Sequence, residues 1–188
     1  NWTTAAATIA DAIGLAGNGS TVVVSNGTYA ISSQILLEKA IDLRGLTGDF
    51  NDVIVDAQNK CRALKVATAG ASVSGITFKR GMEGSVSGAY VYSGSVSNCR
   101  FTANHVRNLG GASDYWQIAT LACDKGTLVD CVVDASDFHE MYRTQRSFGH
   151  IYLLGGAFAE RCVVTNNYNT GHNNMDGSLG KSGSTGVY

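Results

Sequence analysis

Four stretches between residues 73 and 167 share one pattern of apolar and polar positions. Residues 73–81, 96–104, 128–136 and 159–167 each begin with an apolar residue, carry an apolar or cysteine residue three positions later, and a further apolar residue two positions after that. Because side chains two apart in a strand point to the same face, we predict that both columns face one interior. The first column holds Ile76, Cys99, Cys131 and Cys162, and the second holds Phe78, Phe101, Val133 and Val164.

A second short apolar strand precedes each of these stretches. These strands are predicted at residues 63–67, 89–92, 118–122 and 151–154, and small turns rich in glycine, such as the one at Gly94, follow them. The repeating unit is therefore strand, tight corner, strand and a loop of variable length. One such unit cannot bury its own apolar face, so we expect the units to stack with equivalent positions above one another. A β-sandwich is the alternative, but its strands do not repeat in register.

The first third of the chain fits the same plan. Strands are predicted at residues 21–25, 40–44 and 53–56, and residues 4–15 read as a short helix with an apolar face and Gly17 as its stop. A helix there would cap the exposed edges of the first unit. We therefore predict a single domain over residues 1–188, with a cap at about 4–17 and repeating units over about 20–188.

The last residues, 184–188, resemble residues 88–92, the first strand of a unit, but no second strand follows. We expect the chain to be a piece of a longer protein, or its last unit to be completed by another subunit in a dimer or a head-to-tail filament.

Composition removes several classes of protein. The apolar fraction of 44% is ordinary, whereas 23 Gly, no Pro and 15% charged residues favour a sheet ladder over a coiled coil or a disordered chain. A net charge of −1 without a run of basic residues gives no sign of a positively charged surface that would bind nucleic acid. No apolar stretch approaches the roughly 20 residues of a membrane helix, so we expect no membrane insertion. Five cysteines without a CxxC pair argue against a zinc site, and the cysteine column is predicted to be a reduced apolar ladder.

Several segments resemble a known superfamily. The start of pectin-lyase-like right-handed β-helix proteins looks like residues 7–13, 19–29 and 41–45 of this chain. The later units resemble the repeat of those proteins, in which a strand and a glycine precede the pattern x-Asn-Cys-x-Phe-x-x-Asn. The resemblance implies an all-β fold, a right-handed parallel β-helix (a solenoid) with a short N-terminal capping helix. It also implies a secreted or cell-surface protein of bacterial type. The superfamily includes pectate lyases, polygalacturonases, tailspikes, adhesins and passive stalks, so the resemblance alone does not fix an activity.

Three long loops, at residues 102–117, 134–150 and 165–183, leave from the same corner of successive units. Their roots are expected about 4.8 Å apart, so they should build one wall. The loops hold all four histidines and one of the two tryptophans. Aromatic rings with polar neighbours suit a hydroxyl-rich ligand, and we predict that the wall binds polysaccharide. The ligand-binding candidates are His105, Arg107, Tyr115, Trp116, His139, Tyr142, Arg146, Tyr168, His172, Asn174 and Asp176. Alternatively, the loops are simply solvated, and Asn104 and Asn167 stack in a corner ladder.

A catalytic wall is the sharper hypothesis. Two of the three carboxylates Asp137, Glu140 and Asp134 could act as a pair in glycoside hydrolysis, which needs two carboxyl groups roughly 5–9.5 Å apart. Arg143 or Arg146 beside a carboxylate could serve a polysaccharide lyase, since pectate lyases similarly use an arginine base, although their fuller motif is absent from this sequence. Residues 174–177 resemble a fragment of the polygalacturonase Asn-Thr-Asp-Gly signature, but the other elements of that signature are absent.

No cofactor is predicted. Asp134, Asp137 and Asp176 are candidate calcium ligands, but their spacing matches no calcium loop. Three functions remain open at this point: a polysaccharide-binding module, a lyase or glycoside hydrolase acting at the same loops, and a structural or adhesive filament subunit.

Overall fold

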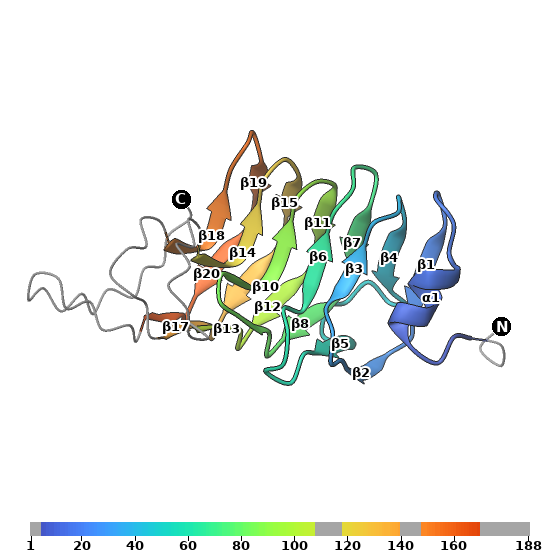
Figure 1. The fold of residues 1–188 in the computed structure, drawn as a ribbon, viewed down its shortest axis with the longest axis horizontal. Coiled ribbons are helices and arrows are strands. Elements are labelled where there is room, and N and C mark those ends of the chain that lie inside the picture. Colours follow the sequence, from blue (N-terminus) through green and yellow to red (C-terminus); the bar gives the residue numbers. More distant parts are fainter. Residues whose placement is uncertain (1–4, 108–117, 140–147, 170–188) are drawn as a thin grey trace, which may run out of the picture.

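The computed structural model describes residues 5–107, 118–139 and 148–169. This part of the chain is mostly β, with one short helix and parallel strands arranged in four sheets (Figure 1). Sheet A, with six strands, contains β1 (Thr21–Val24), β4 (Asp42–Gly45), β7 (Ser72–Ser74), β11 (Ser95–Ser97), β15 (Thr127–Val129) and β19 (Phe158–Glu160). Sheet B, also with six, contains β2 (Gly27–Ala30), β5 (Val53–Asp56), β8 (Thr77–Lys79), β12 (Arg100–Thr102), β16 (Val132–Asp134) and β20 (Val163–Thr165).

The two remaining sheets complete each passage of the chain. Sheet C has the five strands β3 (Ile35–Leu37), β6 (Leu64–Val66), β10 (Val86–Val91), β14 (Ile118–Cys123) and β18 (Phe148–Leu153). Sheet D has the four strands β9 (Met82–Glu83), β13 (His105–Arg107), β17 (Asp137–His139) and β21 (Tyr168–Asn169). The chain passes from sheet A to B to C and back to A, and from the third passage on it enters sheet D between B and C. We call one such passage a circuit.

The corner between sheets A and B turns on a single residue. Gly75, Asn98, Asp130 and Arg161 occupy this corner with φ of 65°, 46°, 53° and 51°. Each stretch that the sequence pattern presented as one strand is therefore two short strands, because the left-handed residue ends the first and starts the second. Gly75 is required at its corner, since a Cβ there would lie 2.9 Å from the Cα of Gly48.

The predicted interior columns are confirmed. Ile76, Cys99 and Cys131 are fully buried, and Cys162 packs half-buried against the same core. Each cysteine Sγ approaches the equivalent carbonyl of the preceding circuit, as Cys99 does with the carbonyl of Val73 at 3.8 Å. All five cysteines are free thiols, and burial raises the pKa of the Cys99 thiol to about 12. The stacking of equivalent residues therefore forms the core.

Helix α1 (Ile9–Leu15) covers the first circuit, as predicted, although it is shorter than residues 4–15. It begins late because Thr8 is extended and acts as N-cap, accepting a hydrogen bond from the Asp11 N–H at 3.0 Å. Ile9 and Ile13 are buried, and Lys39 Nζ donates to the carbonyls at the far end of the helix. None of the described segments forms a helix with the length and hydrophobicity of a membrane span.

Candidate functional site

The roots of the three long loops form sheet D. Because β13, β17 and β21 pair in parallel, His105, Asp137 and Tyr168 lie in one register column, and Arg107 is paired with His139 in another. The predicted common corner is therefore present, because β13, β17 and β21, which lie within the three loop segments, are neighbouring strands of one sheet.

The outer face of sheet D is polar. Val106 and Phe138 are fully buried, so their neighbours His105 and Asp137 point to the opposite side. Nδ1 of His105 contacts Oδ1 of Asp137, and both side chains keep about a quarter of their surface exposed. Tyr168, in the same column, is 61% exposed. This strip combines a paired histidine and carboxylate with an accessible aromatic ring.

Only part of the predicted site falls within the described residues. Sheet D brings His105, Arg107, Asp137 and Tyr168 together, and the backbone of His139 lies beside that of Arg107. Of the three catalytic candidates, Asp137 alone is described, and its carboxylate pairs with a histidine. The candidates that lie outside the described residues are Tyr115, Trp116, Glu140, Tyr142, Arg143, Arg146, His172, Asn174 and Asp176.

Asp134, considered above as a calcium ligand, forms an ion pair. Its Oδ2 lies 2.5 Å from Nη2 of Arg100, on the outer side of sheet B. Among residues 5–107, 118–139 and 148–169, no group of three or more His, Cys, Asp or Glu side chains is placed to hold a metal ion. Asp134 therefore has a structural partner.

The alternative reading of the loop asparagines is confirmed for two of them. Asn104 is fully buried, accepts a hydrogen bond from the Gly81 N–H at 2.7 Å, and donates to the Phe78 carbonyl. Asn167 does the same two circuits further on, with the Ser136 N–H and the Val133 carbonyl, both at 2.9 Å, and Ser136 occupies the equivalent corner between the two asparagines. These amides satisfy backbone groups at the corner between sheets B and D.

His150, which the sequence pattern placed in the polar wall, belongs to β18 and is fully buried. Its ring stacks on Phe138 with centroids 4.4 Å apart, and its Nδ1 lies 3.1 Å from the Thr120 hydroxyl. Burial lowers the pKa of His150 to about 4, because an imidazolium would lose its hydration there. This histidine is therefore part of the interior between sheets C and D.

The structure reveals a second surface that the loop argument missed, on the outer face of sheet C. Lys65, Tyr90, Ala122 and Tyr152 are register partners on successive strands. Val91 and its equivalents point into the core, so this column lies on the opposite face, where Ala122 is fully buried and the half-buried Tyr90 and Tyr152 pack against it. Two strand spacings of about 4.8 Å place the two tyrosines roughly 9.6 Å apart along the stack.

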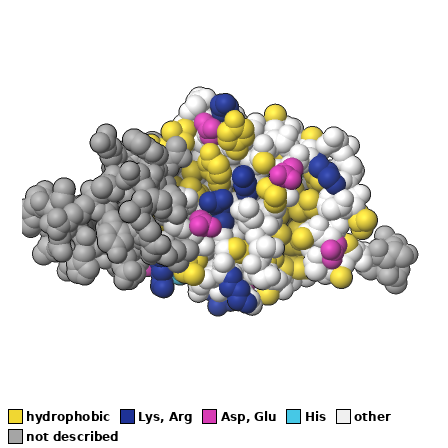
Figure 2. All heavy atoms as spheres, in the orientation of Figure 1, with side chains coloured by type: hydrophobic (Ala, Val, Ile, Leu, Met, Phe, Trp, Pro, Cys, Tyr) yellow, Lys and Arg dark blue, Asp and Glu magenta, His cyan; other side chains and the backbone are white. Residues whose placement is uncertain are grey.

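Arg62 is held against this column. Its Nε donates to the Val86 carbonyl at 2.7 Å, and its guanidinium carbon lies 5.8 Å from the centre of the Tyr90 ring. Burial lowers the pKa of Arg62 and raises that of the half-buried Tyr90 hydroxyl. Figure 2 shows hydrophobic side chains beside cationic and acidic ones on the face of the molecule turned toward the viewer. We call Arg62, Lys65, Tyr90 and Tyr152 the sheet C strip.

A signal for this strip was present in the sequence. The strands 89–92 and 151–154 were aligned as equivalents, and each has tyrosine as its second residue. An outward aromatic at equivalent positions of stacked units marks a surface as clearly as a loop does. Ring faces next to a fixed guanidinium and an ammonium can bind a ligand that presents C–H faces together with hydroxyl or carboxylate groups. Comparison of the chain with protein-family models, curated proteins and solved structures finds no match.

Proposed function

We propose that the chain is a right-handed parallel β-helix of the pectin-lyase-like kind that binds polysaccharide along the sheet C strip, beside the wall of loops that leaves from sheet D. The observation that carries the proposal is the register column of Lys65, Tyr90 and Tyr152, with the Arg62 guanidinium over the Tyr90 ring. The proposal includes a location outside the cell or at its surface, where such a ligand occurs.

A chain-like sugar fits this strip better than a small ligand. The side chains follow the stacking direction of the circuits, and the backbone positions of the two tyrosines lie about 9.6 Å apart, a spacing that suits an extended ligand. The two cations favour acidic sugars, because guanidinium and ammonium groups pair with carboxylates. Sheet D would then border the ligand with His105, Asp137 and Tyr168 on the loop side.

Binding isotherms with polygalacturonate and with a neutral β-glucan test this proposal. We expect binding to polygalacturonate, and at least a tenfold loss of affinity in Tyr90→Ala and in Tyr152→Ala, about 1.4 kcal/mol each. Arg62→Ala should weaken binding of the acidic glycan more than binding of the neutral one.

Two exposed residues on the outer face of sheet A are the controls. Phe158→Ala removes an exposed aromatic ring and Arg44→Ala an exposed cation, and neither should change affinity. Equal affinity in the tyrosine variants and in these controls would contradict the sheet C strip as the binding surface.

A polysaccharide lyase or glycoside hydrolase acting at the same wall is the second candidate function. The contact between His105 and Asp137 favours it, because a carboxylate that holds a histidine is a common arrangement for acid and base catalysis. We would measure release of unsaturated or reducing ends from bound glycans. Turnover that Asp137→Asn and His105→Gln abolish, while glycan binding persists, would support the enzyme; binding without turnover would support the module.

A further inference from the structure

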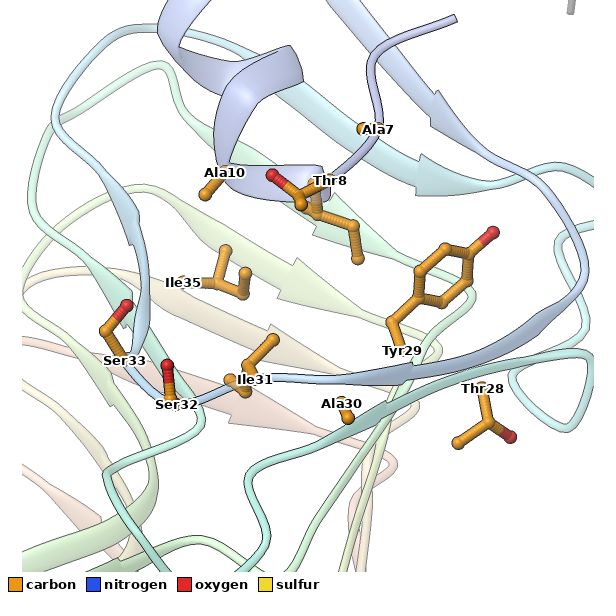
Figure 3. A pocket seen from close by; sticks show the side chains of 11 residues that line it. Ala7, Thr8, Ala10, Thr28, Tyr29, Ala30, Ile31, Ser32, Ser33 and Ile35 are labelled. Carbon is orange, nitrogen blue, oxygen red and sulfur yellow. The ribbon is translucent and has the colours of Figure 1, made fainter.

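The N-terminal end of the molecule has a pocket of its own. It has a volume of about 370 Å³ and lies between the start of helix α1 and the first circuit. Figure 3 shows Tyr29, Ile31 and Ile35 on one side, with Thr8 and Ala10 of the helix start opposite them. The Tyr29 ring is fixed by its hydroxyl, which donates to the Ser25 carbonyl at 2.8 Å. All the residues that line the pocket are apolar or carry a hydroxyl, and none is charged.

Strand β2 borders this pocket with an edge to which no strand of the described residues is paired. It is the last strand of sheet B, and its one neighbour there is β5. The N–H groups of Gly27 and Ile31 donate to the backbone carbonyls of Asp52 and Asp56, on the β5 side. Because alternate residues of a parallel strand direct their backbone groups to opposite sides, the N–H and C=O groups of Thr28 and Ala30 point away from β5. Both residues are exposed and both line the pocket.

Helix α1 limits, by its bulk, which structures can pair with this edge of β2. Helix α1 packs against β1 and β3, on either side of β2, and a helix is about 10 Å thick. The flat end of a second copy would meet the helix before reaching the strand spacing of about 4.8 Å from β2. A single extended segment avoids this clash because it needs no space over the neighbouring sheets.

We propose that this slot binds an extended, uncharged peptide segment of a partner protein, which adds to sheet B beside β2 and places one apolar side chain in the pocket. Backbone hydrogen bonds to Thr28 and Ala30 hold the segment, and the pocket selects its side chain. The absence of charge among the lining residues selects against an acidic or basic residue at that position. This inference is independent of the polysaccharide proposal, since the two surfaces share no residue.

The test uses the full chain and the capped peptide acetyl-Thr-Val-Thr-Val-Thr-amide. In the free protein, the amides of Thr28 and Ala30 should exchange their hydrogen with solvent much faster than those of Tyr29 and Ile31. Saturating peptide should slow exchange at Thr28 and Ala30 at least tenfold, because these amides gain acceptors. The same peptide with alternate amides N-methylated on the edge that would face β2 should not bind.

Two variants and one control locate the site. Ala10→Trp should fill the pocket and abolish peptide binding. Ala30→Pro should weaken binding, because it removes one N–H donor that faces the slot without breaking a hydrogen bond to β5. Leu15→Trp, at the other end of the helix and 84% exposed, is the control and should bind as the unchanged chain does. Unchanged exchange at Thr28 and Ala30, equal binding of the N-methylated peptide, or binding only after removal of residues 1–4 would each overturn the proposal. The last result would assign the slot to the chain's own beginning.

Discussion

The molecule buries side chains in two compartments that follow opposite rules. Sheets A, B and C enclose an apolar interior in which equivalent positions of successive circuits repeat the same kind of residue, as Val55, Phe78, Phe101 and Val133 do. Between sheet D and the first half of sheet C, the buried residues are both apolar and polar. The Phe138 ring stacks on the His150 ring, and the Thr120 hydroxyl forms a hydrogen bond with His150.

The difference follows from what each compartment must satisfy. In the apolar interior, stacked strands pair their own backbone groups, so side chains need only fill space. Beside sheet D the chain turns through corners that leave backbone groups unpaired, and the amides of Asn104 and Asn167 complete them. Substitutions in the apolar interior should therefore lower stability by removing packing contacts. Substitutions beside sheet D should lower it by leaving buried polar groups without partners, and stability there should depend on pH.

The largest effect is expected from Phe101→Ala in the apolar interior. The Phe101 ring is fully buried and stacks on Phe78 with centroids 5.5 Å apart. The change leaves a cavity between circuits and should lower the free energy of unfolding by about 3–5 kcal/mol, measured by denaturant titration. Phe158→Ala, at an exposed ring, is the control. Similar small losses in both variants would mean that Phe101 is not enclosed.

The next effect is a dependence of stability on acid that arises from His150. Its folded pKa of about 4 lies below the ordinary 6.5, so the unfolded chain binds a proton more readily. This contribution is constant above pH 6.5, and stability falls as the pH drops toward 4, by on the order of 3 kcal/mol. Asp137 is the charged group that opposes the shift, by favouring the imidazolium.

Thermal unfolding between pH 7 and 4 of the unchanged chain and of His150→Leu measures this dependence. The variant should lose most of the slope between pH 6.5 and 4, because it lacks the imidazole whose pKa folding lowers. An identical slope in both chains would place the acid sensitivity elsewhere.

A smaller effect is expected from Asn104→Ala at the corner between sheets B and D. The Gly81 N–H and the Phe78 carbonyl lose their partner while they remain buried, which should cost about 2 kcal/mol. Asn51→Ala, at an exposed turn, should cost much less in the same denaturant titration. Equal losses would show that water reaches the corner and replaces the amide.

The smallest effect is expected at the ion pair of Arg100 with Asp134. Arg100→Gln should lower the free energy of unfolding by less than about 1 kcal/mol, because the arginine side chain is 37% exposed and water screens the pair. Added calcium should not change the melting temperature of the unchanged chain or of Arg100→Gln. A calcium-dependent rise would mean that Asp134 is a metal ligand after all.

The two compartments also differ in how far the sequence predicts them. The repeated apolar columns at Ile76 and Phe78 predict stacked units and the residues inside them, because burial alone selects residue type there. The corner between sheets A and B was missed, since four different residue types adopt the left-handed conformation there: Gly75, Asn98, Asp130 and Arg161. His150 was misplaced because a histidine in a polar stretch reads as exposed, and no local pattern reveals the ring of Phe138 above it.

For the candidate site, sequence predicted the common corner of the loops but not the sheet C strip. Loops draw attention through their unusual composition, whereas Tyr90 and Tyr152 are single residues in ordinary strands. They form a surface only once the register of the circuits brings them into one column. Register is a property of the stacked fold, and one strand alone does not encode it.

The central claim is that the chain winds through the same sheets in register, and one distance tests it. Thr21 and Phe158 are 137 positions apart in the sequence and lie in one outward column of sheet A, five strand spacings apart through Asp42, Ser72, Ser95 and Thr127. Spin labels on ketone-bearing residues introduced at these two positions leave the native thiols untouched. Pulsed electron double resonance should then give a narrow distribution centred near 24 Å between the two backbone sites, allowing for the label arms. A broad distribution, or a mean beyond about 40 Å, would contradict the stacked circuits and every surface assigned from them.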